Sequence, residues 1–112
     1  MHELFSYTST SAQSEGDIAM TNASAYPFLT IVFSYSTTDN TYVSVTIPNT
    51  IGKKASAFVY ASDSTRLYVG ARVVEIKDAT HLTLGQGYLF MGSVTPNADN
   101  SYALVRRVYG HY

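Results

Sequence analysis

Two neighbouring runs of β-branched and aromatic residues constrain the fold of this chain more than any other feature. They span Phe28–Tyr35 and Thr41–Ile47 and contain the residue types that fit a pleated, half-buried surface. Because side chains alternate between the two faces of a strand, each run has one continuous apolar face. These faces consist of Leu29, Ile31, Phe33 and Tyr35 in the first run, and of Val43, Val45 and Ile47 in the second. Five turn-forming residues separate the runs, which together predict a β-hairpin that supplies much of the core.

The rest of the chain continues this pattern of short strands separated by turns. No segment carries the 3.6-residue apolar period of a helix longer than about two turns. With 112 residues the chain is long enough to form one domain with its own core. We therefore predict a single all-β domain over residues 1–112, with about eight short antiparallel strands in a β-sandwich, of which a jelly roll is one form. Besides the hairpin, strand-like segments lie at residues 2–8, 17–20, 53–61, 66–77, 81–84, 88–91 and 101–109.

The segment at residues 9–22 interrupts the strand pattern. It consists mainly of Ser, Thr, Ala, Gln and Gly, apart from a short strand-like stretch at Asp17–Met20. Such a composition buries little apolar surface. It predicts a polar loop or arm whose backbone amides are weakly protected in the isolated protein and become ordered against a partner surface.

The longest strand candidate, residues 66–77, changes its apolar phase along its length. Leu67, Val69 and Ala71 share one face, whereas Val74 and Ile76 share the other. Because an extra residue in a strand moves every later side chain to the opposite face, this change predicts a bulge near Arg72–Val73 or a bend between two strands.

Charge and cysteine content exclude several classes of function. The chain has no cysteine, which excludes disulfides, thiolate nucleophiles and zinc–thiolate sites. Seven Lys and Arg residues against eight Asp and Glu residues leave a net charge of −1, which argues against the clustered basic face of a nucleic-acid binder. No run approaches the roughly 20 apolar residues of a membrane span. The first residues lack the basic and apolar regions of a signal peptide, so we expect no export by the secretory route.

The residue types that carry catalysis are present without the spacing that catalysis needs. Gly85–Gly87 follows a strand, as a phosphate-binding turn does, but lacks the third glycine and the helix after it. The histidines, at positions 2, 81 and 111, show no metal-ligand spacing, and there is no Gly-x-Ser-x-Gly motif. We therefore expect no enzymatic activity, catalytic residue, cofactor or metal site. A glycosidase-type pair of carboxylates stays open, because the distance between two acids is not visible in a sequence.

Ten tyrosines, abundant Ser and Thr and only 13% charged residues are typical of a contact surface, although an all-β protein also uses these residues simply as strand formers. Two basic pairs stand out, at positions 53–54 and 106–107. Consecutive side chains of a strand point to opposite faces, so one arginine of the second pair is expected at a sheet edge or subunit contact, or at a solvated edge that blocks strand addition. The candidate interface consists of Lys53, Lys54, Tyr88, Phe90, Arg106, Arg107 and Tyr109.

Four motifs, in this order along residues 26–110, resemble the small β domains of tailed-phage structural proteins. Tyr26–Tyr35 is similar to their aromatic strand, and Val45–Pro48 to the apolar segment and proline that follow it. Thr80–Tyr88 resembles their Thr-rich strand, which ends in a Gly-x-Gly-aromatic turn. Asn100–Gly110 resembles their closing strand, which runs into a Val-Tyr-Gly tail.

The resemblance implies a binding and structural module of the virion that needs no cofactor. The chain has no fibre shaft and is similar in size to capsid decoration proteins. It is therefore expected to be a homo-oligomer, a dimer or trimer, which is made in the host cytoplasm and binds the major capsid protein on the outer surface of the head shell. No contact with nucleic acid or membrane is implied. The alternative is a fibre-tip or tail module that recognises a host glycan or protein, and a small glycan-active enzyme comes third.

Overall fold

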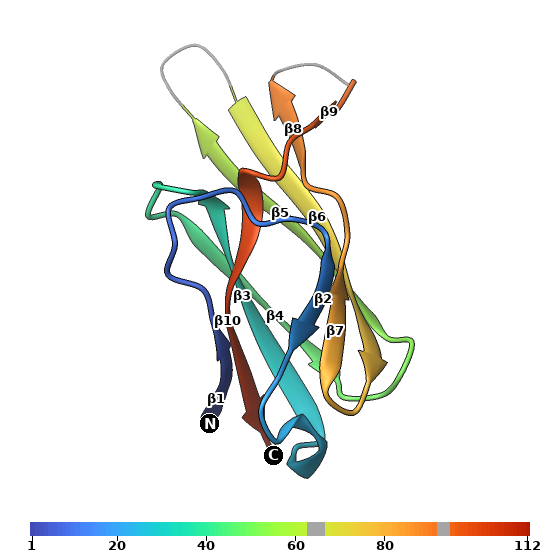
Figure 1. Cartoon of the computed structure of the whole chain (residues 1–112). Helices are drawn as coiled ribbons and strands as arrows, with labels where there is room; N and C mark the ends of the chain where they lie inside the picture. The colour runs from blue at the N-terminus through green and yellow to red at the C-terminus, as the bar shows by residue number, and fades with distance from the viewer. Residues whose placement is uncertain (63–66, 92–94) are drawn as a thin grey trace.

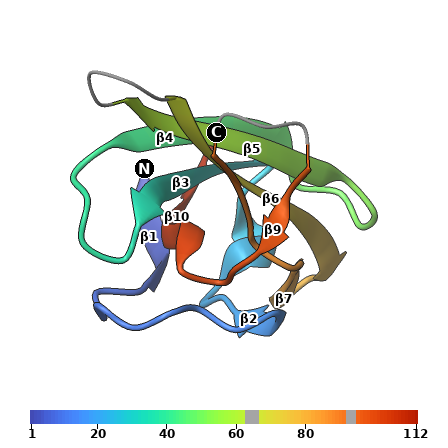
Figure 2. The same cartoon turned by 90° about the horizontal axis from the view of Figure 1, so that it is seen from above.

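The computed structural model describes residues 1–62, 67–91 and 95–112 and consists of two antiparallel sheets packed against each other (Figures 1 and 2). The predicted β-sandwich is therefore confirmed, and the jelly-roll form stays a prediction. The first sheet has the order β1 (His2–Ser6), β10 (Tyr102–His111), β3 (Phe28–Ser36), β4 (Tyr42–Pro48). In the second sheet β6 (Leu67–Asp78) pairs on one side with β5 (Lys54–Ser62) and on the other with β7 (His81–Leu84) and β8 (Tyr88–Met91). Strand β2 (Gly16–Ala19) pairs with β7 and β9 (Asn97–Ala98) pairs with β8, so β2, β5 and β9 are the edge strands of this sheet. A short 3₁₀ turn spans Ala23–Ala25.

The predicted hairpin forms as β3 and β4, in the register that places Phe33 opposite Val43 and Ile31 opposite Val45. Phe33 and Ile31 are fully buried between the sheets. Val43 and Val45 are only half-buried, because β4 is the outermost strand of its sheet and lies at an open side of the sandwich. The expectation that these two valines are core residues is therefore met only in part.

The second sheet buries small side chains from β5 and larger ones from its other strands. Ala55, Ala57 and Val59 face the core from β5, as their alternation predicts. Val74 and Ile76 of β6 meet them from the neighbouring strand. Both sheets thus present alternate residues to one shared core.

The bulge expected near Arg72–Val73 of β6 is absent, because β5 and β6 pair along their whole length without a register shift. Arg66, the first residue of the expected strand, lies outside the described residues. The irregularity lies instead on the opposite side of β6, between β7 and β8. There two residues of β6 face the three residues Gly85–Gly87, so the extra residue belongs to the partner segment. Gly70, Arg72 and the buried apolar residues of β6 consequently share one inward phase.

Arg72 is the polar group at the centre of this region, and only 2% of it is exposed. Its Nη1 donates to the carbonyl of Gln13 at 2.9 Å, and its Nη2 donates to Oδ1 of Asn100 at 2.7 Å. Burial lowers the pKa of the Arg72 guanidinium to about 10, so the group stays charged at neutral pH. A Cβ at Gly87 would lie 2.6 Å from the backbone carbonyl oxygen of Asp99 and would also clash with the Arg72 guanidinium, so a larger residue at this position would require the backbone to shift.

The polar segment at residues 9–22 is mostly exposed, as its composition predicts, but three of its residues pack on the body of the protein. Gln13, Ile18 and Met20 are buried, and β2 pairs with β7. The Gln13 side chain accepts from the backbone N–H of Val105 at 2.7 Å and donates to its carbonyl at 3.0 Å. The composition correctly predicted that the segment has few large apolar groups. It did not predict that the side-chain amide of Gln13 bonds the backbone of Val105, as a neighbouring strand would.

Replacing Gln13 by alanine is expected to lower the free energy of unfolding by about 1–3 kcal/mol, because the fully buried Val105 N–H and C=O lose their partner. Chemical denaturation measures this loss, and hydrogen exchange should show faster exchange at the Val105 amide. Ser11→Ala is the control, since Ser11 is exposed in the same segment. Equal stability of the two variants would contradict the role assigned to the glutamine.

Candidate functional site

Large apolar side chains cover the outer surface of the second sheet where β5, β6 and β8 lie side by side (Figure 1). Cross-strand pairing places Phe58, Ala71 and Tyr88 in one row and Tyr60, Val69 and Phe90 in the next. Phe58 is 65% exposed and Tyr60 is 64% exposed. We call this surface the aromatic face, and it consists of Phe58, Tyr60, Leu67, Val69, Ala71, Val73, Tyr88 and Phe90.

The aromatic face arises because β5 buries its small side chains and exposes its large ones. Its inward positions carry three alanines and a valine, whereas its outward positions include Phe58 and Tyr60. An aromatic side chain buries 150–250 Å² when it is fully covered, so these two residues expose about 250 Å² between them. Monomeric soluble proteins rarely expose contiguous apolar patches of more than a few hundred Å², and larger ones mark interaction sites.

Charged residues occupy the other end of the same sheet surface. Lys54 Nζ lies 3.8 Å from Glu75 Oε1, and Lys77 Nζ lies 2.5 Å from Asp17 Oδ2. Lys77 lowers the pKa of Asp17, whose carboxylate in turn raises the pKa of Lys77. The outer surface of the second sheet is thus divided into an uncharged aromatic part and a part with paired charges.

The predicted interface residues do not form one surface. Tyr88 and Phe90 belong to the aromatic face, and exposed Lys54 lies on the same sheet at the charged end, next to exposed Lys53. The remaining three, Arg106, Arg107 and Tyr109, lie on β10 in the first sheet. The structure therefore divides the candidate interface between the two sheets.

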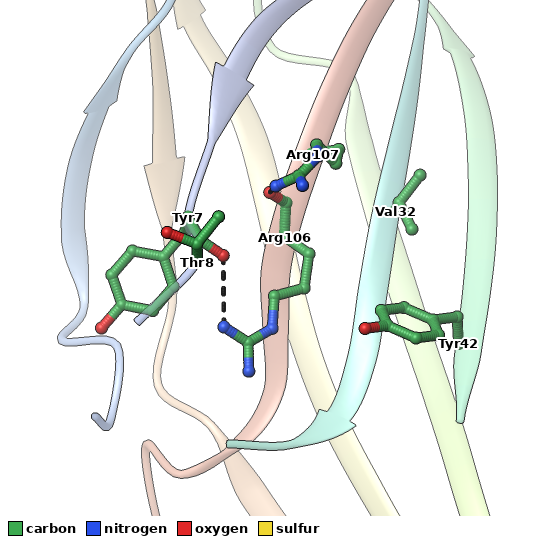
Figure 3. Close-up of a pocket in the computed structure, with 6 residues that line it drawn as sticks. All are labelled: Tyr7, Thr8, Val32, Tyr42, Arg106 and Arg107. Atoms are coloured by element: carbon green, nitrogen blue, oxygen red, sulfur yellow. Dashed lines mark hydrogen bonds between the residues drawn. The ribbon is translucent and has the colours of Figure 1, made fainter. Parts of the chain in front are cut away.

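Arg106 is held entirely by contacts within the chain (Figure 3). Its Nη1 donates to the carbonyls of Tyr7 at 3.1 Å and Ser9 at 2.6 Å, and its Nη2 donates to the carbonyl of Thr37 at 2.8 Å. Its Nε donates to Ser34 Oγ at 3.0 Å, and the guanidinium lies 5.7 Å from the centre of the Tyr7 ring. This arginine therefore joins the N-terminal segment to the β3–β4 connection and has little capacity left for a ligand.

Arg107 points to the outer surface of the first sheet, where its Nε lies 3.2 Å from Glu3 Oε1 and its Nη1 donates to Ser6 Oγ at 2.6 Å. Strand β10 lies between β1 and β3, so neither arginine lies at the expected sheet edge, and Arg107 pairs with a carboxylate of the neighbouring strand β1. A pocket of about 360 Å³ lies beside the two arginines, lined by Tyr7, Thr8, Val32, Tyr42, Arg106 and Arg107. Tyr109 is half-buried, opposite Thr30 of β3.

One histidine, His81, contacts a neighbouring carboxylate. His81 is partly exposed and its Nδ1 lies 3.1 Å from Asp78 Oδ1, which also accepts from the Thr80 N–H at 2.8 Å. Asp78 therefore acts as a turn residue and also contacts the histidine. No group of three or more His, Asp or Glu side chains in the described residues is placed to hold a metal ion.

Sequence reasoning missed most of the aromatic face. In the sequence Phe58 and Tyr60 alternate with Ala55, Ala57 and Val59, but they were not singled out as contact residues. The signal was the pattern itself, because a strand with small residues on its inward face and aromatic residues on its outward face exposes the larger set.

The fold and the aromatic face define a β-sandwich with one uncharged apolar surface. No protein-family model matches the chain, and no curated protein or solved structure was found to match it. Within the described residues, no helix has the length and apolar character needed to cross a bilayer.

Proposed function

We propose that this protein is a non-enzymatic structural module of a tailed-phage virion, which binds the outer surface of the head shell and stabilises it. The aromatic face carries the proposal, because an exposed, uncharged and contiguous apolar surface is the chemistry of a protein contact. The resemblance of residues 26–110 to small phage β domains is the reason for proposing that this contact is made in a virion. The major capsid protein is the proposed partner.

The composition of the aromatic face suits a specific contact. Aromatic side chains are enriched at the centres of protein interfaces, where charged residues are depleted. A stable interface covers roughly 800 Å² on each partner. Phe58 and Tyr60 together expose about 250 Å², so the face supplies the apolar centre of such a contact and the surrounding polar residues supply its rim.

A receptor-binding role is the second candidate, and the outer surface of the first sheet favours it. Phe28 stacks on His111 with ring centres 5.9 Å apart. Thr30 Oγ1 lies 2.8 Å from both Thr46 Oγ1 and His111 Nε2. The exposed Phe28 ring, the half-buried His111 ring and the nearby hydroxyl groups provide stacking and hydrogen bonds, which are the interactions that a host glycan would use.

Particles that lack this protein are expected to assemble, to break at a lower temperature than complete particles, and to adsorb to cells normally. The reason is that a ligand which binds only the intact shell adds its binding free energy to shell stability. Thermal release of the packaged genome measures particle stability, and the fraction of particles bound to cells measures adsorption.

Copy number in purified virions provides the control for this experiment. A head-shell protein is present in hundreds of copies and a fibre-tip protein in a few tens at most, and quantitative mass spectrometry distinguishes the two. Loss of adsorption with unchanged particle stability would contradict the decoration role and support receptor binding.

A further inference from the structure

Strand β4 forms one edge of the first sheet and presents unpaired backbone groups along its length. It pairs with β3 on one side, and no other strand of the described residues pairs with it. The Tyr35 N–H donates to the Thr41 carbonyl and the Asn49 N–H to the Pro27 carbonyl, which assigns the odd-numbered residues to bonds with β3. The backbone N–H and C=O groups of Tyr42, Ser44 and Thr46 therefore point outward.

This edge lacks the devices that protect the other edges of the two sheets. Strand β1 has a register shift and carries Glu3, and β2 has only four residues, one of them Asp17. Strand β5 begins with Lys54, which Lys53 precedes, and β9 has two residues. Strand β4 has no charged residue, no register shift and no proline before its last position. Exposed edges of this kind are templates for pairing with another strand.

We propose that β4 pairs antiparallel with β4 of a second copy of this chain, about a two-fold axis that passes through Ser44. This axis places Tyr42 opposite Thr46 of the second copy and Ser44 opposite its own equivalent. All outward backbone groups of the five residues 42–46 are then paired, which gives about six hydrogen bonds. The two first sheets become one continuous sheet.

A second copy fits this edge because β4 is complementary to itself. The pairing brings no like charges together, since residues 40–50 contain no Asp, Glu, Lys, Arg or His. Val43 lies opposite Val45 of the second copy, and both valines are half-buried and point toward the core. A groove of about 280 Å³ runs between β4 and β5, lined by Thr41, Tyr42, Val43, Phe58, Val59 and Tyr60. Apolar side chains of the second copy would lie at the mouth of this groove. The inference does not depend on the proposed function.

Cysteine cross-linking tests the register, and the chain has no cysteine of its own. Opposite residues of a hydrogen-bonded antiparallel pair have Cα atoms about 5.5 Å apart, within the range of a disulfide. Ser44→Cys is therefore expected to form a covalent dimer under mild oxidation. Thr46→Cys alone should not, because its two copies would lie about 13 Å apart. A mixture of Thr46→Cys and Tyr42→Cys should form the mixed dimer.

A charge at the axis tests the dimer without a cross-link. Ser44→Lys is expected to weaken dimerisation at least tenfold, because it places two ammonium groups directly opposite each other. Ser56→Lys is the matched control, since Ser56 is also exposed and lies on the other long edge strand. Light scattering after size-exclusion chromatography measures mass, and circular dichroism checks that both variants keep their fold.

Three results would overturn the inference. The first is a protein that stays monomeric up to its solubility limit, which would leave β4 as an acceptor for a strand of a different protein. The second is a dimer that Ser56→Lys dissociates while Ser44→Lys does not, which would move the contact to β5. The third is self-cross-linking of Thr46→Cys with none in Ser44→Cys, which would exclude the register.

Discussion

Replacing Phe33 by alanine is expected to lower the free energy of unfolding by about 3–5 kcal/mol, which is a large share of the roughly 5–15 kcal/mol available to a domain. Phe33 is fully buried between the sheets, and it pairs with Val43 on one side and with Val105 on the other. Removing its ring loses the transfer free energy of the buried atoms and leaves a cavity that strands on both sides hold open. Chemical denaturation and thermal melting measure the loss.

Phe58→Ala is the matched control for this experiment, because it removes the same ring from a position that is 65% exposed. A surface substitution usually changes stability by no more than about 0.5 kcal/mol. A Phe33→Ala variant whose melting temperature falls by only a degree or two would contradict the assignment of this residue to the core. Equal loss in both variants would contradict the division between the core and the aromatic face.

The double substitution of Phe58 and Tyr60 by alanine is expected to weaken attachment to the head shell about 100-fold or more, without a matching loss of stability. Both side chains are about two-thirds exposed, so folding gains little from them. Aromatic anchors at the centre of an interface commonly contribute 2 kcal/mol or more each. Binding of the purified variant to particles that lack the protein gives the affinity.

Ile51→Ala is the control for attachment. Ile51 is 68% exposed and lies in the connection between β4 and β5, which joins β5 at its charged end next to Lys54. It should bind as the unchanged protein does. Normal attachment of the double variant would show that the aromatic face does not contact the shell.

The fold could be predicted where one face of a strand is buried and the other is not. In β3 and β4 the alternation of apolar residues set the strand limits, the pairing and most of the inward face. A slip of one residue would move every apolar side chain of such a strand to the solvent, so the pattern admits one register. This is why the hairpin was predictable from residues 28–47 alone.

The parts that could not be predicted depend on buried polar groups. Arg72 points inward because Gln13 and Asn100 accept its hydrogen bonds, and these partners are distant in the sequence. Taken by itself, an arginine between two apolar phases indicates a bulge. The extra residue is in the segment Gly85–Gly87, which connects β7 to β8 and runs beside Arg72 of β6.

The sequence predicted that the candidate site is a contact surface, but it identified only some of the residues that form it. Tyr88 and Phe90 were identified from their aromatic character, and they lie on the aromatic face. Phe58 and Tyr60, the most exposed members of that face, were not identified. The two arginines of β10 were selected for their charge, but their bonds go to carbonyls, a serine and Glu3 of the same chain. A sequence does not reveal whether a charged group has an internal partner.

The position of β10 between β1 and β3 has a consequence for the order in which the protein folds. Six strands separate β3 from β10 along the chain, and β10 is also the only neighbour of β1 in the described structure. During synthesis β3 can pair with β4 at once, but its other edge stays open until the whole second sheet has been made. Because pairing between distant segments must overcome a large loss of chain entropy, folding is expected to take milliseconds to seconds. The newly made hairpin, with one unpaired edge and an uncovered apolar face, is the species most in need of a chaperone.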